Sequence, residues 1–313
     1  MKIVEKEEVF EKLQMDTCIA LMREAMMALE SKKASQPVRA MAKLPHGEVL
    51  GFMPAYLGEN DYFGAKVVNS FPQNVGTGYS SHNGYVMVFE SAHGTCAGLA
   101  DADAITQIRT GAVSAVATDL LARKDAKTLG IIGAGAQGRS HLEAILCVRP
   151  GIETVKIYDI RREAAEVYKN EMEAKFGRPV ILCDSPKEAV LDCDIVCTVT
   201  PSKEAYLEAE WIRSGTHINA VGTFSPTTRE VTSALMARSS LYADQIEALK
   251  KESGEYLIPL SEGLITEEHI KGSIGQILLG QIPGRMSEEE ITLFDALGLA
   301  VEDVICGRYL CCL

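Results

Sequence analysis

The stretch GAGAQG, Gly133 to Gly138, constrains this 313-residue chain more than any other feature. It follows the apolar run TLGII and precedes RSHLEAIL, which has a helical pattern. At such a strand-to-helix turn, Gly133 permits the sharp bend, Gly135 lets a pyrophosphate approach the backbone, and Gly138 lets the helix pack closely on the strand. The helix N-terminus adds N–H donors and a positive dipole end. We therefore predict a dinucleotide-binding turn.

Asp159 ends the next predicted strand, TVKIYD, where a carboxylate would accept the ribose hydroxyls of a dinucleotide. A carboxylate repels the 2′-phosphate of NADP, so NAD is the expected cofactor. Arg161 and Arg162 follow at once. They either offset that repulsion, which leaves NADP open, or form an ordinary solvated helix start. The candidate cofactor-binding residues are Gly133, Gly135, Ala136, Gln137, Gly138, Asp159, Arg161, Thr200 and Gly222.

Strand patterns alternate with helical patterns from Lys127 onward. This alternation is typical of a parallel, doubly wound sheet, so the fold class is α/β with a Rossmann-type domain. The predicted strands are TLGIIG, TVKIYD, DIVCTV, HINAVG and SLYAD.

The first third of the chain has a different pattern. Residues 16–31 have the apolar spacing of an amphipathic helix, and residues 37–99 predict a mostly antiparallel sheet. Residues 101–122 are dense in small residues and predict one or two buried helices.

The segment SEEEITLFDALGLAVEDV, residues 287–304, is helical in period, and Ser287 with Glu290 would form a capping box at its start.

Composition excludes several classes of partner. The formal net charge of −12 argues against a nucleic-acid surface, which needs clustered Lys and Arg. The charged N-terminus does not resemble a secretory signal, and no apolar run approaches the about 18 residues that a membrane span needs. The nine scattered cysteines are best interpreted as reduced thiols of a cytoplasmic protein. We expect no metal site, because Cys193 and Cys197 have no paired Cys or His cluster.

Several motifs, in order, resemble the ornithine cyclodeaminase and mu-crystallin family. They are GFMPAY, AKVVNSFPQN, RTGAVSAVATDLLARKDAKTLGIIGAGAQG, NAVGTFSPTTREV and TLFDALGLAVEDV. The resemblance implies a homodimer whose chain has two domains. An NAD(P)-binding Rossmann domain would cover residues 119–282, and an α+β substrate-binding and dimerisation domain would combine residues 1–118 with 283–313.

The resemblance also implies a basic cluster that holds the carboxylate of an amino or imino acid. By motif match the cluster is Arg39, Lys66 and Arg109. Arg binds a carboxylate with a planar fork, and Lys adds a movable charge. Lys66 and Arg109 are the candidate catalytic residues, with Lys66 orienting or protonating an imine nitrogen. His82 and Phe224 are further candidates for substrate binding.

Two acids of the cyclodeaminase pattern are missing here. Phe224 stands two residues after Gly222, where cyclodeaminases resemble one another in having Asp, and Gly51 replaces an acid near the Met-Pro step. Both departures resemble the mu-crystallin and imine-reductase branch. A cyclodeaminase needs a carboxylate for proton transfer and for its diamine substrate, whereas a reductase of a ready-made cyclic imine does not. An apolar Phe224 beside the substrate ring fits the second reaction.

The preferred function is therefore an NAD(P)H-dependent reductase of small cyclic imino acids. The substrates would be pyrroline-2-carboxylate or piperideine-2-carboxylate, and the products proline or pipecolate. One alternative is ornithine cyclodeaminase, which would draw its acid from Glu48, Glu90 or Asp103. The others are an amino-acid dehydrogenase of alanine type and a non-catalytic protein that binds nucleotide or another ligand.

Overall fold

The computed structural model describes residues 1–74, 77–80 and 82–312. The chain divides into two compact units. Unit 1 combines Met1–Arg109 with Leu299–Leu313, and unit 2 is Thr110–Gly298. These bounds differ from the expected 1–118 with 283–313, because the last strand of the chain before residue 299 belongs to the sheet of unit 2.

Unit 1 contains a six-stranded sheet in the order β1-β6-β5-β4-β3-β2. Neighbours from β2 to β6 are antiparallel, as the sequence predicted, and β1 adds in parallel to β6. The strands are β1 (Lys2–Val4), β2 (Ala40–Lys43), β3 (Val49–Tyr56), β4 (Tyr62–Ser70), β5 (His82–Glu90) and β6 (Cys96–Asp101). The helices that accompany them are α1 (Lys6–Lys12), α2 (Met15–Glu30), η1 (Pro72–Asn74), α3 (Ala102–Leu121) and α11 (Ala300–Cys312).

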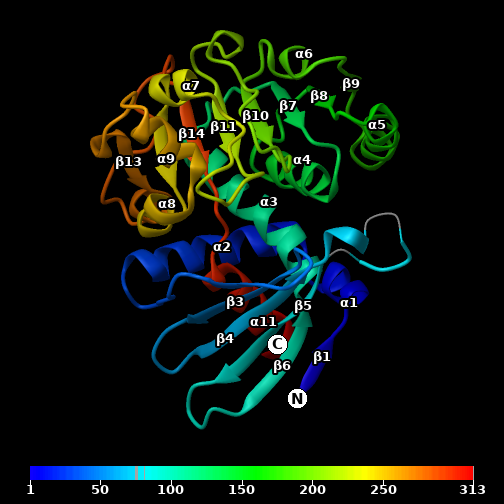
Figure 1. Ribbon diagram of the computed structural model, residues 1–313, viewed down its shortest axis with the longest axis vertical. Helices are drawn as coiled ribbons and strands as arrows, with labels where there is room; N and C mark the ends of the chain where they lie inside the picture. The colour runs from blue at the N-terminus through cyan, green and yellow to red at the C-terminus, as the bar shows by residue number, and fades with distance from the viewer. Residues whose placement is uncertain (75–76, 81, 313) are drawn as a thin grey trace. The chain divides into compact units, whose positions relative to one another are not determined.

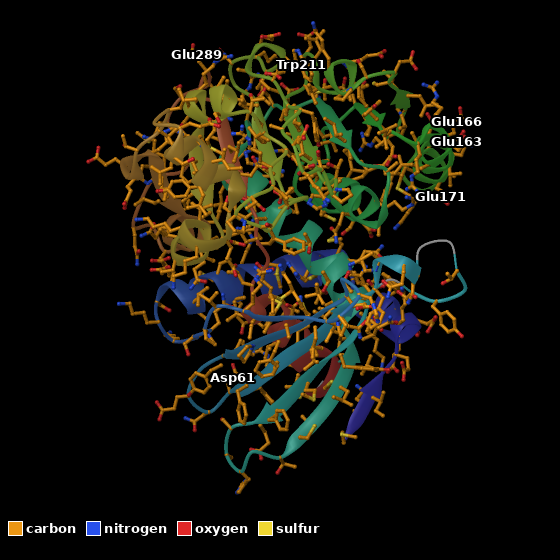
Figure 2. The ribbon with its side chains drawn as sticks, viewed as in Figure 1. Asp61, Glu163, Glu166, Glu171, Trp211 and Glu289 are labelled. Atoms are coloured by element: carbon orange, nitrogen blue, oxygen red, sulfur yellow. The ribbon has the colours of Figure 1, made fainter. Side chains whose placement is uncertain are left out.

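The C-terminal helix α11 lies on one face of this sheet and contacts α2 on its other side (Figure 1). Gly307 makes the close approach possible, because a Cβ there would lie 2.8 Å from a Val88 methyl group. Arg308 fixes the helix by ion pairs with Asp61, labelled in Figure 2, and with Glu24 of α2. Helix α11 is therefore part of the core of unit 1.

The opposite face of the sheet keeps apolar side chains in solvent. Strand β3 alternates between the two faces, so that Met53 and Ala55 are buried while Leu50, Phe52 and Tyr56 are exposed. Strand alternation with period two explains this division. Such an apolar surface is unusual for the solvated side of a sheet.

Unit 2 contains an eight-stranded sheet whose neighbouring strands are all parallel. Its order is β13-β12-β14-β11-β10-β7-β8-β9, so the direction of winding reverses between β7 and β10. The strands are β7 (Thr128–Ile132), β8 (Thr154–Tyr158), β9 (Val180–Leu182), β10 (Ile195–Thr198), β11 (His217–Ala220), β12 (Ser240–Ala243), β13 (Ile270–Ser273) and β14 (Thr292–Asp295). This is the doubly wound α/β sheet that the sequence predicted, and a ligand crevice is expected at the reversal.

Helices cover this parallel sheet. Along α5 the residues Ala165, Tyr168 and Met172 are buried, whereas Glu163 and Glu166 point into solvent (Figure 2). The helices of unit 2 after α3 are α4 (Ala136–Val148), α5 (Arg162–Phe176), α6 (Pro186–Val190), η2 (Ala209–Trp211), α7 (Ser233–Arg238), α8 (Ile246–Glu252), α9 (Gly254–Ser261), η3 (Glu267–His269) and α10 (Ile274–Leu278). Within the described ranges no helix is long and apolar enough to cross a membrane.

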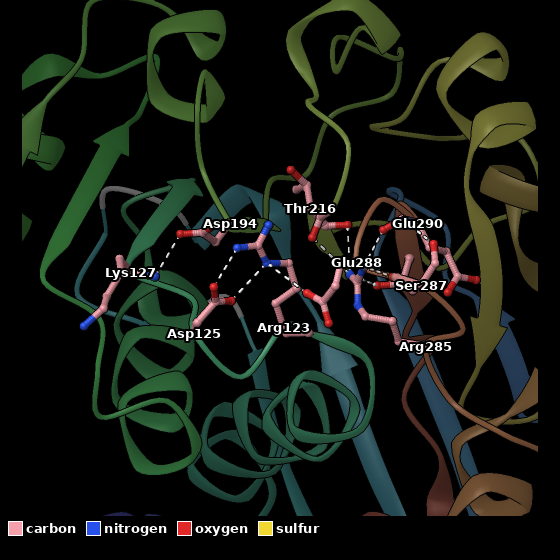
Figure 3. Close-up of polar contacts among 12 residues, drawn as sticks. Arg123, Asp125, Lys127, Asp194, Thr216, Arg285, Ser287, Glu288 and Glu290 are labelled. Atoms are coloured by element: carbon pink, nitrogen blue, oxygen red, sulfur yellow. Dashed lines mark hydrogen bonds and ion pairs between the residues drawn. The ribbon is translucent and has the colours of Figure 1, made fainter.

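The predicted helix over residues 287–304 is wrong in its first half. Residues 287–291 form turns around the Arg285 guanidinium, which donates to the carbonyls of Ser287 and Glu290 (Figure 3). The expected Ser287–Glu290 contact exists, since the Glu290 N–H donates to Ser287 Oγ at 3.2 Å, but it closes a turn and caps no helix. The following apolar residues enter the parallel sheet as β14, and the helix begins only at Ala300.

Candidate active site

The glycine-rich turn after β7 has the geometry that the fingerprint predicts. Gly133 has φ +112°, and a Cβ there would lie 2.8 Å from the Val199 carbonyl oxygen. A Cβ at Gly138 would lie 2.1 Å from the Gly133 carbonyl oxygen. Gly135, by contrast, has open space on its Cβ side, since no heavy atom lies within 4 Å of a Cβ built there. The fold therefore requires glycine at positions 133 and 138, whereas the backbone of Gly135 is open to a ligand.

Helix α4 begins at Ala136 with no side chain capping its N-terminus. The Gly135 position is the N-cap, so the first N–H groups of α4, including those of Ala136 and Gln137, lie next to the open side of the turn. Exposed N–H groups and the helix dipole together favour an anion at this place. The turn can therefore hold a pyrophosphate.

Asp159 lies directly after β8, and its carboxylate is fixed by backbone donors. Oδ2 accepts the N–H of Ala134 at 2.8 Å, and Oδ1 accepts the N–H of Arg161 at 2.9 Å. The Arg161 guanidinium lies 3.7 Å from the same carboxylate, with its own side chain 71% exposed. Arg162 is engaged elsewhere, by Asp184 and Glu166. One acid and one mobile cation thus lie at the strand end where the ribose is expected.

Glu230 joins the two loops that follow β10 and β11. Its Oε1 accepts the N–H and hydroxyl of Thr200 at 2.8 and 2.6 Å and the Tyr206 hydroxyl at 2.7 Å. Its Oε2 accepts the Gly222 N–H at 2.9 Å. A Cβ at Gly222 would lie 2.1 Å from the Thr200 carbonyl oxygen, so only glycine fits there. The two predicted cofactor-binding positions, Thr200 and Gly222, are therefore held together by a buried carboxylate that the sequence analysis missed.

Further buried acids surround Glu230. The Glu255 carboxylate accepts the Glu230 N–H at 2.6 Å, and Asp244 accepts the N–H of Leu297 at 2.8 Å. Asp295, at the end of β14, accepts the Ser253 hydroxyl. Burial, with the nearby charge of Glu230, raises the pKa of Asp295 to about 7. Ionisation of these acids inside the protein costs free energy, because burial removes water from the charged carboxylate.

The predicted basic cluster assembles inside unit 1. Lys66 on β4 and Arg109 on α3 are 4% and 5% exposed, and the charge of Arg39 acts on Lys66. Lys66 Nζ also lies 3.4 Å from the Thr106 hydroxyl. The three residues are far apart in sequence, and the antiparallel sheet with α3 brings their charges to one place. Whether they bind substrate stays a prediction.

Two acids from α11 complete this cluster. Asp303 Oδ2 lies 2.7 Å from Lys66 Nζ, and its Oδ1 accepts from Arg109 Nε at 3.2 Å. Glu302 accepts from Arg109 Nη1 at 2.8 Å. Both acids are fully buried. We name Arg39, Lys66, Arg109, Glu302 and Asp303 the carboxylate-binding cluster, after the role predicted for its three cations.

The pKa values of the two buried cations shift in opposite directions. Burial lowers the pKa of Lys66 to about 8; Asp303 opposes this shift, while Arg109 and Arg39 add to it. For Arg109 burial also acts to lower the pKa, but Asp303 and Glu302 raise it above its ordinary value. Arg109 is therefore a permanent cation, whereas Lys66 can gain or lose a proton near neutral pH.

The remaining predicted residues lie elsewhere. His82 starts β5 in an exposed position opposite Ser70, four residues before Val86, which pairs with Lys66. Phe224 follows β11 in unit 2 and is 57% exposed. A substrate-binding role for either residue stays a prediction.

The three acids proposed as cyclodeaminase substitutes are bound by other groups. Glu48 accepts from Gln73 and the His46 N–H. Glu90 accepts N–H groups of the β5–β6 turn, mainly that of Thr95, which lowers its pKa to about 2. Asp103 forms an ion pair with Lys6.

The signal that could have found Asp303 and Glu302 was the ED pair inside GLAVEDV, two acids within an apolar run. Charged residues inside apolar runs are buried with a partner when they are buried at all. Glu230 carried no such signal, since it stands in the mostly polar stretch PTTREVTS after β11. The sequence does not indicate which residues pair with these acids.

Comparison with known proteins is consistent across the chain. The model of the ornithine cyclodeaminase/mu-crystallin family matches residues 1–311. A Delta(1)-pyrroline-2-carboxylate reductase of Bacillus cereus is 34% identical over 312 residues, covering 99% of this chain and 95% of the relative.

Two solved structures are similar over nearly the whole chain. The Delta(1)-pyrroline-2-carboxylate reductase of Thermococcus litoralis, in complex with NADH and L-proline, has TM-score 0.95 and 36% identity and covers 99% of this chain and 96% of its own. An archaeal alanine dehydrogenase dimer with bound NAD has TM-score 0.92 and 33% identity, covering 98% and 94%. These similarities extend over both units.

Proposed function

Because the chain belongs to the ornithine cyclodeaminase/mu-crystallin family, we propose that it is an NAD(P)H-dependent reductase of small cyclic imino acids. The substrates are pyrroline-2-carboxylate or piperideine-2-carboxylate, and the products are proline or pipecolate. The observation that carries this proposal is the buried carboxylate-binding cluster, in which a permanent cation, Arg109, stands beside a lysine of adjustable charge, Lys66.

The cofactor, held at the glycine-rich turn, supplies a hydride when it is bound. A cyclic imino acid takes up that hydride at C2, and its nitrogen must carry a proton for C2 to be electrophilic. Arg109 and Arg39 hold the substrate carboxylate. Lys66, with a pKa of about 8, keeps or returns the proton at the nitrogen in the neutral range. The balanced reaction consumes one imine, one NAD(P)H and one proton.

NAD is the proposed cofactor, with NADP possible. The fixed Asp159 carboxylate supports NAD, since it would repel a 2′-phosphate. Both similar structures contain NADH or NAD. The exposed Arg161 guanidinium beside Asp159 supports some use of NADP. Initial rates with NADH and NADPH at equal concentration measure the preference, and Asp159→Ser should shift it toward NADPH.

An amino-acid dehydrogenase of alanine type is the second candidate. The similar archaeal alanine dehydrogenase favours it, because that enzyme also acts on a small amino acid. The discriminating assay offers pyruvate with ammonia in one cuvette and pyrroline-2-carboxylate in another, each with NADH. Faster oxidation of NADH with pyruvate and ammonia would show that the substrate is an open-chain compound and not a cyclic imine.

Ornithine cyclodeaminase activity is tested in the same experiment. L-ornithine is incubated with NAD, and proline and ammonia are measured, since the net reaction leaves NAD unchanged. We expect none, because Phe224 replaces the acid and because Glu48, Glu90 and Asp103 are bound elsewhere. A protein that binds NADH but converts none of these substrates would be a non-catalytic binding protein.

We propose a homodimer formed by the exposed apolar face of the six-stranded sheet. A dimer is known for the similar alanine dehydrogenase. Leu50 on this face is 41% exposed, and Leu191 in unit 2 has the same exposure. Leu50→Glu should therefore yield monomers in light scattering, whereas Leu191→Glu should not. Equal masses for the two variants would refute this interface.

We also propose that the protein works in the cytoplasm. None of the nine cysteines, all of which lie within the described residues, forms a disulfide, and five of them are buried. A reducing compartment suits this arrangement.

A further inference from the structure

Asp303 differs from the other members of the carboxylate-binding cluster because it touches both buried cations. It lies on the C-terminal helix α11, is fully buried, and pairs with Lys66 Nζ at 2.7 Å and Arg109 Nε at 3.2 Å. Its neighbour Glu302 reaches Arg109 at 2.8 Å through the other side of the guanidinium. Asp303 is therefore the one acid of this pair that contacts the lysine.

The cluster combines three cations with two acids. Arg39, Lys66 and Arg109 contribute three positive charges when all are protonated, and Glu302 and Asp303 contribute two negative ones. If Lys66 loses its proton, the cluster loses one positive charge and its attraction for the substrate carboxylate falls.

The surroundings of Lys66 make its charge depend on Asp303. Arg109 and Thr106 face it from α3, Arg39 faces it from the segment before β2, and Asp303 faces it from α11. The flanking strand positions are Met53 on β3 and Val86 on β5, which carry no charge. Burial and both arginines favour a neutral lysine, and Asp303 opposes them.

We propose that Asp303 is a positioning residue that keeps the Lys66 ammonium charged and aims it, together with Arg109, at the substrate. The residue acts through Lys66 and does not itself touch the reacting atoms. This inference rests on the proposed function for its kinetic consequences, although the ionisation of Lys66 can be measured without any reaction.

The kinetic test compares pH profiles of kcat/KM for pyrroline-2-carboxylate and NADH. For wild type the rate should fall above pH about 8, where Lys66 loses its proton. In Asp303→Asn this fall should begin at least about one pH unit lower, because an opposite charge within a few ångströms shifts a pKa by about 1–3 units. Ionisation of the substrate is common to all variants, so it cancels in the comparison.

Two further variants control this experiment. Glu302→Gln removes an equally buried acid that touches Arg109 but not Lys66, so its profile should keep the wild-type alkaline limb. Asp303→Glu keeps the charge and should restore the limb even where its longer side chain lowers the rate. Thermal unfolding shows whether each variant folds. If Asp303→Asn does not fold, Asp303→Ser, which removes the same charge with a smaller side chain, takes its place in the comparison with Glu302→Gln and Asp303→Glu.

The activity-independent test is an NMR titration of [ε-¹³C]lysine in the NADH-bound protein. The Lys66 signal is assigned by its loss in Lys66→Arg. It should titrate near pH 8 in wild type and clearly lower in Asp303→Asn. A Lys66 that titrates near its ordinary value, or equally in both proteins, overturns the role of Asp303. A downward shift in a protein that reduces no imine would instead retain this role and refute the proposed function.

Discussion

The substitution Glu230→Gln tests whether a buried carboxylate holds the two strand-end loops of unit 2 in place. Glu230 is fully buried and accepts four hydrogen bonds, three from Thr200 and Tyr206 on one oxygen and one from Gly222 on the other. Glutamine keeps the size of the side chain but replaces one acceptor oxygen by an NH2 group. The new NH2 group must then face either the Gly222 N–H or the donors of Thr200 and Tyr206, and those donors lose their acceptor.

The magnitude follows from the bonds that are lost. A buried donor left without an acceptor costs about 1–3 kcal/mol, and a hydrogen bond to a charged acceptor contributes about 1.5–3 kcal/mol. We expect Glu230→Gln to lower the free energy of unfolding by about 2–4 kcal/mol. For a unit of this size the melting temperature should fall by about 5–10 °C. Displacement of the loops that carry Thr200 and Gly222 should weaken NADH binding at least about tenfold, or about 1.4 kcal/mol.

The assays are thermal unfolding by circular dichroism and titration of NADH fluorescence. Glu204→Gln is the matched control, because Glu204 lies in the loop after β10 that carries Thr200 and has an exposed side chain. A Glu230→Gln protein that melts and binds NADH like wild type would refute the reasoning. It would mean that Glu230 is already protonated in the native protein, a state favoured by burial, which raises its pKa.

Three further outcomes are expected. Gly135→Ala should fold normally, since its Cβ meets no atom within 4 Å, but should weaken NADH binding in a fluorescence titration, because the methyl group occupies the approach of the pyrophosphate. Asp295→Asn should raise the melting temperature at pH 8. Burial raises the pKa of Asp295 from 3.8 to about 7. Wild type therefore loses up to about 4 kcal/mol of stability as the pH rises from about 4 to about 7. Melting curves at pH 5 and pH 8 should show no such loss for the variant. Arg109→Lys should raise the KM for pyrroline-2-carboxylate at least about tenfold and leave the Kd of NADH unchanged, because lysine cannot form the guanidinium fork; an unchanged KM would remove Arg109 from the substrate site.

The dinucleotide turn was predictable because every requirement is local. Positive φ at Gly133 and the contact of Gly138 with the Gly133 carbonyl arise within six residues. The alternation of strand and helix from Lys127 onward likewise follows from short-range patterns. Family membership and fold class, inferred from such motifs, are both confirmed.

The end of the chain was harder to predict for a physical reason. Residues 287–304 combine acids with apolar residues at helical spacing, and spacing alone cannot distinguish a helix from a turn followed by a short buried strand. The Arg285 guanidinium decides the outcome, because it binds the carbonyls that a helix would have used. The short strands β9, β13 and β14 were also missed, although β10, β11 and β12, with four residues each, were predicted.

The partners of the basic cluster could not be predicted from the sequence, although its cations could. Arg39, Lys66 and Arg109 were identified by motif match to the family, and of the three Arg109 also stands out as a charge amid small residues. Asp303 is 194 residues from Arg109 and meets it only because α11 returns to the sheet of unit 1. Local patterns carry no information on such a contact.

The position of the acids bears directly on the choice between reductase and cyclodeaminase. The chain does not lack carboxylates near its basic cluster; it has two, but both come from α11 and both are paired with cations at 3.2 Å or less. An acid that neutralises Lys66 and Arg109 is not available to bind the distant amine of ornithine or to carry its proton. The acids expected of a cyclodeaminase would instead stand at the positions of Gly51 and Phe224, where this chain has none. The replacement of both acids favours reduction of an imine that is already cyclic.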